Sequence, residues 1–203
     1  MKKQNIKQHH RRSIRLKEYD YSKAGAYFVT ICTLDKKHIF GGIRNGLVEL
    51  AMIGKIANEF WVEIPKHFED VKLDEFIIMP NHIHGIIFVN DVNVGVQNFE
   101  PLQKQNRFQQ IIPKSICSII RAYKSSVTHW CKLNGHEHFK WQRNYWEHVI
   151  RNEDKLNKIR QYIQFNPLKW HLDRENAERT GTDRLEDEIF ASKIKMKARL
   201  NTG

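Results

Sequence analysis

The chain has 203 residues, of which 40% are hydrophobic and 28% are charged, and its formal net charge is +11 at pH 7. A chain of this length can bury a core of its own, and the composition is that of a soluble globular protein. The surplus of positive charge indicates a polyanionic partner, nucleic acid first and an anionic membrane surface second. Because no apolar stretch approaches the length needed to span a bilayer, a transmembrane protein is excluded.

The amino terminus and the cysteines predict a cytoplasmic protein. The first residues are polar and then basic, with no apolar segment for secretion. Cys32, Cys117 and Cys131 are scattered and odd in number, which is typical of reduced thiols. Cys131 with His136 and His138 loosely resembles a zinc site, but a single thiol without a second cysteine pair argues against that interpretation.

The hydrophobic pattern predicts one domain between a basic arm and a charged tail. Residues 1–25 form the arm, which is either simply solvated or grips phosphate groups on binding. Residues 26–170 form the domain, and 171–203 form a tail that is either one amphipathic helix or partly disordered.

The hydrophobic periodicity and the turn residues predict the elements of the domain in chain order. The first half contains a strand at 27–33, a short hairpin around 41–48, a helix from Ala51 to about Trp61 that Pro65 ends, and two strands over 71–89. A long polar loop over 90–112 follows. The second half contains a helix from Pro113 to about Leu133, extended segments at 139–142 and 145–150, and a helix from Asn152 to about Asn166.

The order of these elements predicts an α+β fold. Strands in runs with two packing helices indicate a ferredoxin-like antiparallel sheet with helices packed on one face. The C-terminal helix of the domain, which contains Tyr162, is then free to lie over the sheet face that carries two histidines.

Those histidines lie in the central hairpin. Residues 76–89 are almost wholly β-branched or aromatic, and Pro80-Asn81 supplies the turn. Because side chains alternate along a strand, His82 and His84 share one face while Ile83 points to the other. Two adjacent imidazoles can hold one divalent ion. The alternative is a pair of buried histidines that hydrogen-bond to backbone, but burying two polar rings without strong partners is costly.

A phenol and an amide occupy one face of the last helix of the domain. Tyr162 and Asn166 are four residues apart, so they stack on that face. Beside His82 and His84 they complete a site in which the imidazoles and the Asn166 oxygen bind Mg²⁺ or Mn²⁺ and the phenol attacks phosphorus. A phenol of ordinary pKa, about 10, needs a metal or a base nearby to react at neutral pH. In the alternative, Tyr162 is a core aromatic and Asn166 is a helix C-terminal residue before Pro167.

These residues carry a resemblance to a known family. The stretch Met79-Pro80-Asn81-His82-Ile83-His84 is similar to the HUH motif, in which a bulky apolar residue separates two histidines. The segment 141–152, followed by Tyr162-Ile163-Gln164-Phe165-Asn166-Pro167, resembles the REP-associated tyrosine transposases, which are single-tyrosine HUH transposases. The similarity spans residues 10–172. It implies that Tyr162 is the catalytic nucleophile and that His82, His84 and Asn166 are metal ligands.

The resemblance also implies a substrate and a reaction. The substrate is single-stranded DNA with hairpins, and cleavage leaves a 5′-phosphotyrosine and a free 3′-hydroxyl. The DNA is then rejoined to another end without ATP, because the phosphotyrosine keeps the energy of the broken bond. The protein is expected to work in DNA recombination as a monomer or a homodimer, with the tyrosine helix serving its own subunit or a neighbour's.

Cations and aromatic rings scattered through the domain are candidates for DNA binding. Cations would hold phosphates, together with the arm, and rings would stack unpaired bases, although each could equally be a surface charge or a core ring. Tyr145 is also the rival nucleophile, but it has no partner four residues on. Glu147 and His148 could add a base or a ligand, or simply lie on an exposed strand edge. The DNA-binding candidates are Arg121, Lys124, Trp141, Arg143, Tyr145 and Arg151.

Two other functions compete with the transposase. A histidine-triad nucleotide hydrolase would share His82-Ile83-His84, but it would need a further histidine where Ile86 stands. A domesticated, non-catalytic DNA-binding protein of the same fold would be favoured if the tyrosine or a ligand were lost. All four positions are intact, which ranks this alternative second.

Overall fold

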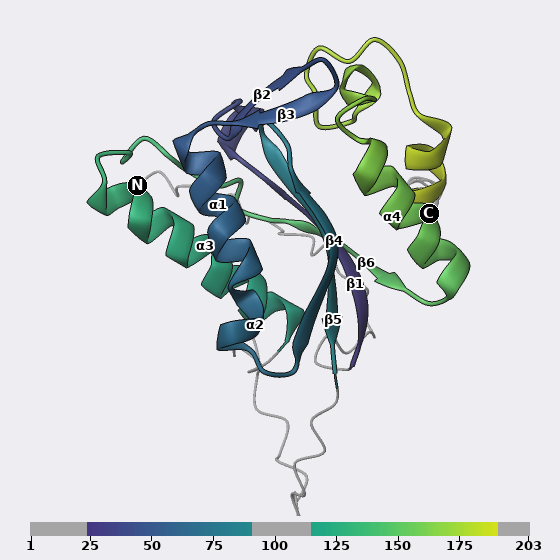
Figure 1. The fold of residues 1–203 in the computed structure, drawn as a ribbon, viewed down its shortest axis with the longest axis horizontal. Helices are drawn as coiled ribbons and strands as arrows, with labels where there is room; N and C mark the ends of the chain where they lie inside the picture. The colour runs from purple at the N-terminus through teal and green to yellow at the C-terminus, as the bar shows by residue number, and fades with distance from the viewer. Residues whose placement is uncertain (1–23, 91–114, 191–203) are drawn as a thin grey trace, which may run out of the picture.

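The computed structural model describes residues 24–90 and 115–190 of the chain (Figure 1). The predicted arm, apart from its last two residues, nearly all of the predicted long loop and the end of the predicted tail lie outside the described residues. The division into arm, domain and tail stays a prediction.

A four-stranded antiparallel sheet forms the centre of the molecule. It consists of β1 (Gly25–Cys32), β4 (Val71–Ile78), β5 (His82–Val89) and β6 (Trp146–Ile150), in the spatial order β4-β5-β1-β6. Each neighbouring pair is antiparallel. Since the chain passes from β1 to β4 and from β5 to β6 through helices, this is the ferredoxin-like arrangement, and the predicted α+β class is confirmed.

The two faces of the sheet carry different helices (Figure 1). α1 (Met52–Val62) and α3 (Ile116–Leu133) cover one face, where their apolar residues pack on Tyr27, Ile83 and Ile87. α4 (Glu153–Phe165) lies on the other face and packs on Phe28 and Ile86. Strand alternation thus divides β5 between two cores, and the even-numbered residues face α4.

Helix ends mostly follow local signals. The Asn152 side chain accepts a hydrogen bond from the Lys155 N–H (2.9 Å), so it is the N-cap of α4 as predicted. α3 begins at Ile116, with Ser115 as its N-cap. α1 ends at Val62, and Pro65 lies in the first turn of a further short helix, α2 (Ile64–His67), rather than ending α1 itself. Proline is accepted there because first-turn N–H groups have no helical partner.

A second, two-stranded sheet follows β1 and a short 3-10 helix, η1 (Leu34–Lys36). Its strands, β2 (Gly41–Arg44) and β3 (Leu47–Leu50), are joined by Asn45 and Gly46, both at positive φ, as a two-residue hairpin turn requires. Of the segments predicted as extended, 145–150 contains β6, whereas 139–142 contributes a single bridge between Trp141 and Thr33.

The chain after α4 folds back toward the sheet. A 3-10 helix, η2 (Trp170–Leu172), follows α4, and residues 184–190 are helical. Ile189 and Phe190 are buried against Phe28 and Tyr162. No helix among the described residues is both long and apolar enough to cross a membrane.

Gly85 on β5 provides a test of the packing beneath α1. A Cβ at this position would overlap the ring of Trp61, which is fully buried and stacks on Phe76. We expect Gly85→Ala to lower the free energy of unfolding by about 1–3 kcal/mol, because overpacking a closed core forces side chains from their rotamers. Urea denaturation measures this. Gly42→Ala on β2, where nothing lies within 4 Å of the added atom, is the matched control; equal midpoints for the two variants would contradict the packing described.

Candidate metal centre and tyrosine site

The turn between β4 and β5 orients His82. Asn81 is fully buried and donates through Nδ2 to the backbone oxygens of Lys36 (3.1 Å) and Glu175 (2.8 Å). Its Oδ1 is therefore the acceptor for Nδ1 of His82, 2.7 Å away. Since Nδ1 carries the proton, Nε2 of His82 keeps its lone pair, which is the state that binds a metal.

His84 lies beside His82 on the face toward α4. The ring centroids are 4.3 Å apart, and Nδ1 of His84 is 2.9 Å from Oγ1 of Thr30 on β1. Both histidines are completely buried. Burial and the neighbouring imidazole lower the pKa of His82 to about 4, so this ring is neutral at pH 7. The prediction that both imidazoles share one strand face is confirmed by this geometry.

Tyr162 on α4 meets this pair from across the core. Its hydroxyl is 3.1 Å from Nε2 of His84, 3.0 Å from Oε1 of Glu186 and 3.3 Å from Oδ2 of Asp173. Burial, with the two carboxylates, raises the pKa of Tyr162 well above its usual value of 10. The phenol is therefore neutral in this arrangement.

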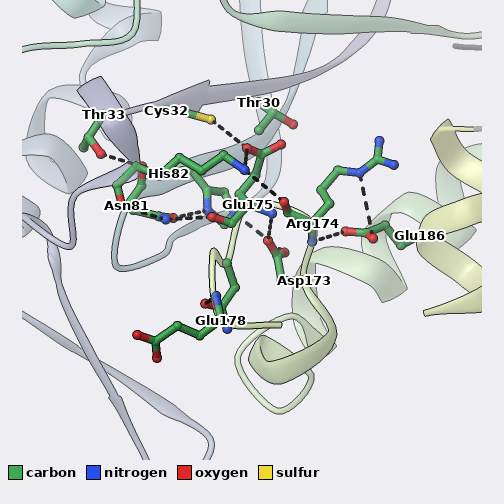
Figure 2. Close-up of polar contacts among 12 residues, drawn as sticks. Thr30, Cys32, Thr33, Asn81, His82, Asp173, Arg174, Glu175, Glu178 and Glu186 are labelled. Carbon is green, nitrogen blue, oxygen red and sulfur yellow. Dashed lines mark hydrogen bonds and ion pairs between the residues drawn. The ribbon is translucent and has the colours of Figure 1, made fainter. Parts of the chain in front are cut away.

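Asp173 was not predicted from the sequence, yet it lies at the middle of the centre. Its Oδ2 is 3.9 Å from Nε2 of His82 and 3.8 Å from Nε2 of His84, and it accepts a hydrogen bond from Nδ2 of Asn166 (2.7 Å). Burial opposes its charge, but the histidines and Asn166 hold the pKa of Asp173 well below its usual range. Figure 2 shows Asp173 and Glu175 reaching toward Asn81 and His82.

The residues present fit a divalent metal ion. In the described part of the chain, Nε2 of His82 and Oδ1 of Asn166 are buried without a hydrogen-bond partner. His82, His84 and Asp173 offer ligand atoms that all lie within 4.8 Å of one another. An ion about 2.1 Å from two ligand atoms keeps them at most about 4.2 Å apart, which matches the distances from Asp173 to both rings. The centre is thus a candidate metal site.

Residues 173–190, here called the covering segment, close the centre. They supply Asp173, Glu175 and Glu186, and the side chain of Glu186 also accepts from the Arg174 N–H (2.9 Å). The cavity that remains beside Tyr162 has a volume of about 10 Å³, roughly that of one water, and is lined by Tyr162, Asn166, Lys169, Asp173, Asp183 and Glu186. In this arrangement Tyr162 is only 3% exposed.

A second feature gathers four of the predicted DNA-binding residues. A cleft of about 450 Å³ between α3 and residues 141–143 is lined by Arg121, Lys124, Ser125, Thr128, His129, Lys132, Trp141, Gln142 and Arg143. Nζ of Lys124 donates to the Gln142 oxygen (2.7 Å), and Nε1 of Trp141 donates to the Lys124 oxygen (3.0 Å). Because α3 covers the sheet face away from α4, this cleft lies on the opposite side from the two histidines.

The other two DNA-binding candidates lie elsewhere. Tyr145 is half-buried and packs against the core beneath α1 and α3, and burial raises its pKa. Arg151 is exposed between β6 and α4. Glu147 and His148 are half-buried on β6. The zinc alternative gains no support, since among the described residues Cys131, His136 and His138 do not form a ligand cluster.

The comparisons with known proteins agree with this fold. The chain shares its fold with the REP-associated tyrosine transposase whose structure was solved bound to a REP hairpin: the TM-score is 0.53, at 19% identity over 78% of this chain and 74% of that one. A putative REP-associated tyrosine transposase of Haemophilus influenzae is 27% identical over 152 residues, 74% of each chain. The resemblance found in the sequence is confirmed. No protein-family model matches the chain.

The chain also has a nearer relative. It belongs to the same family as an uncharacterised protein of Haemophilus influenzae, to which it is 44% identical over 174 residues, 85% of this chain and 96% of the relative.

An ion pair fixes α4 against the sheet and so positions Tyr162. A register shift in β4 between Leu73 and Phe76 includes Asp74. The Asp74 carboxylate receives two hydrogen bonds from Arg160 on α4, at 2.9 and 2.7 Å. Arg160 holds the pKa of Asp74 below its usual value. A bulge commonly re-aims a side chain in this way.

Asp74→Asn tests this anchor. Since the pKa of Asp74 is lower in the folded protein, the pair stabilises the fold fully above the unfolded-state pKa of about 4, and this contribution is lost as the pH falls through the still lower folded-state pKa. We expect a loss of about 1 kcal/mol at pH 7 that becomes progressively smaller as the pH falls below about 4, measured by urea denaturation. Glu63→Gln, which breaks the exposed pair with Lys66, is the control. A loss that does not shrink as the pH falls below about 4 would contradict the assignment.

Proposed function

We propose that the protein is a metal-dependent single-strand DNA endonuclease and strand transferase that acts through a phosphotyrosine at Tyr162. The observation that carries this is the Tyr162 hydroxyl, 3.1 Å from Nε2 of His84 and facing the two-histidine strand. The relatives named as transposases support a transposase-like DNA-processing function. The solved relative was bound to a REP hairpin, and we propose hairpin-containing single-stranded DNA as the substrate here too.

His82 and His84 would supply two metal ligands. Asn166 and Asp173 each have a side-chain oxygen that could supply a third ligand. A bound Mg²⁺ or Mn²⁺ would supply charge neutralisation at the scissile phosphodiester. The Tyr162 oxygen forms the new bond to phosphorus, the bond to the 3′ oxygen breaks, and the 3′ oxygen leaves as a hydroxyl. Glu186 accepts from the hydroxyl at 3.0 Å in the closed arrangement, but it belongs to residues 173–190. Water admitted when those residues move would therefore take the phenolic proton and protonate the departing 3′ oxygen.

The reaction requires the covering segment to move. A cavity of about 10 Å³ does not admit a nucleotide, and Tyr162 is almost completely buried. α4 and β5 are held by core packing along their length. The covering segment reaches the centre through polar groups, namely the side chains of Asp173 and Glu186 and the backbone oxygen of Glu175. It packs on the core only near its end, through Leu185, Ile189 and Phe190. We therefore place the opening in the covering segment, with the closed form described here as the state without DNA.

The cleft on α3 supports a nucleic-acid site on the other face of the sheet. Four cations line its walls, and the Trp141 ring lies among them; the cations are Arg121, Lys124, Lys132 and Arg143. Cations that neutralise phosphates account for most of the affinity in non-specific binding, and an aromatic ring can stack an unpaired base. We propose that this cleft binds the DNA, with the protein working as a monomer or homodimer in the cytoplasm.

A non-catalytic DNA-binding protein of the same fold is the second candidate. The burial of Tyr162 beneath the covering segment favours it. The intact tyrosine and histidines favour the enzyme, because a binding protein would have no use for a phenol that meets Nε2 of His84.

Tyr162→Phe is the sharpest test of the enzyme. It removes one oxygen with little change in packing, so it should abolish the covalent adduct with a 3′-labelled single-stranded hairpin in Mn²⁺ while leaving DNA affinity unchanged. Tyr123→Phe, which removes another buried hydroxyl bonded to the Ala57 oxygen (2.8 Å), is the matched control and should keep the adduct. Mass spectrometry locates the nucleotide. A nucleotide on Tyr145, or an adduct that survives in Tyr162→Phe, would overturn the assignment.

The cleft is tested by removing its cations. The double variant Arg121→Ala, Arg143→Ala should bind hairpin DNA at least about tenfold more weakly at 100 mM salt, with a shallower dependence of log K on log salt, because each lost phosphate contact removes about one released counterion. Fluorescence anisotropy measures both quantities. Lys55→Ala on the exposed side of α1 controls for net charge. If Lys55→Ala weakens DNA binding as much as Arg121→Ala or Arg143→Ala alone does, the cleft is not the DNA-binding site.

A further inference from the structure

Lys169 brings a positive charge to the small cavity beside Tyr162. The other residues that line this cavity include three carboxylates, Asp173, Asp183 and Glu186. Within the described part of the chain, Lys169 is the one cation among the lining residues. A phosphodiester that approaches Tyr162 therefore meets several negative side chains and one positive side chain, and the position of Lys169 favours one place for a phosphate oxygen.

The backbone after α4 places Lys169 on the face that carries Tyr162. The helical turn continues beyond the end of α4, because the Lys169 N–H donates to the oxygens of Phe165 (3.1 Å) and Asn166 (3.1 Å). Lys169 follows Asn166 by three residues and Tyr162 by seven, and such positions share one helix face. The packing of α4 on the sheet holds this arrangement without help from the covering segment.

In the closed arrangement Lys169 is paired with a residue of the covering segment. Its Nζ lies 2.8 Å from Oδ2 of Asp183. The Lys169 side chain is 41% exposed, and a pair that is partly open to solvent contributes little to stability, so a phosphate group can replace the carboxylate. Asp183 moves with the covering segment, whereas Lys169 stays with α4. Opening of the segment would therefore leave the ammonium group beside Tyr162 without its partner.

We propose that Lys169 is a catalytic residue that binds a non-bridging oxygen of the scissile phosphodiester in place of the Asp183 carboxylate. The inference deepens the proposed function and rests on it, because it takes Tyr162 to be the nucleophile. While the Tyr162 oxygen bonds to phosphorus and the bond to the 3′ oxygen breaks, the non-bridging oxygens carry negative charge. An ammonium that donates a hydrogen bond to one of them stabilises that charge and keeps its own proton throughout. Lys169 acts from the α4 side, across the centre from the strand that carries the two histidines.

The first experiment measures single-turnover rates of adduct formation on the 3′-labelled hairpin at saturating DNA and Mn²⁺. Lys169→Met should lower the rate at least about 100-fold, as removal of one donor to a reacting centre usually does. Asp183→Asn breaks the same ion pair but keeps the ammonium, and asparagine can still accept from the Leu185 N–H, so its rate should equal or exceed that of the unaltered protein. If the pair only holds the covering segment, both variants change the rate alike, which overturns the proposal.

Lys158 provides the matched control. It lies on α4 and pairs with Glu188 of the covering segment, also at 2.8 Å, but it does not line the cavity. Lys158→Met should therefore keep the rate of the unaltered protein. An equal loss in Lys158→Met and Lys169→Met would show that both lysines only anchor the segment, and would overturn the proposal. An unaltered protein that forms no adduct contradicts the proposed function itself, whereas an adduct formed equally fast by Lys169→Met removes Lys169 alone.

A second experiment locates the contact on the DNA. It uses the Tyr162→Phe background, which leaves the DNA uncut, and a hairpin with a methylphosphonate at the linkage that the adduct identifies. There a methyl group replaces one non-bridging oxygen and removes the charge. Lys169→Met should weaken binding of the native linkage at least about threefold and leave binding of the methylphosphonate nearly unchanged, as measured by fluorescence anisotropy. An equal loss for both linkages places the contact on another phosphate and overturns the proposal.

Discussion

The centre of this protein depends on the cost of placing two imidazoles inside an apolar sheet. Polar rings buried without partners are expensive, and the strand alternation that makes β5 a core strand also buries His82 and His84. Each ring is therefore held from its outer nitrogen, by Asn81 or by Thr30, so that both inner nitrogens converge on one point. The turn before β5, β1 and the segment after α4 each place a side chain beside the two histidines, namely Asn81, Thr30 and Asp173.

Local patterns predict the fold well because the sheet has two clearly different faces. The period of two in β5 assigns Ile83 to one core and His84 to the other, and the helical period of α4 assigns Tyr162 to the face that His84 occupies. The prediction that Pro65 ends α1 is wrong. Proline can follow the end of one helix or lie in the first turn of the next, and the sequence pattern does not distinguish these two positions when a short helix follows directly.

The place of Asp173 and Glu186 in the centre could not be predicted from the sequence, for a different reason. They lie in a stretch rich in acidic and basic residues, which is predicted to be either one amphipathic helix or partly disordered. Their burial arises only from tertiary contacts with β5 and α4. One signal was present: Asp173 follows Asn166 by seven residues, close enough for the chain to fold back onto the same centre. Four of the six residues predicted to bind DNA line the basic cleft, but that they form one cleft, and its place on the α3 side of the sheet, follow from the path of α3.

The covering segment affects both access to Tyr162 and its acidity. Burial and the two nearby carboxylates each raise the pKa of the phenol, because both disfavour a negative oxygen at that point. Moving residues 173–190 away would admit water and remove Glu186 from the hydroxyl, and both changes return the phenol toward its ordinary acidity. Under the proposed function, the movement that admits a phosphodiester would thus also make the phenol easier to ionise. A closed centre with a neutral phenol and an open centre with a more acidic one would then be two states of the same few contacts, and the tyrosine would react only where DNA is bound.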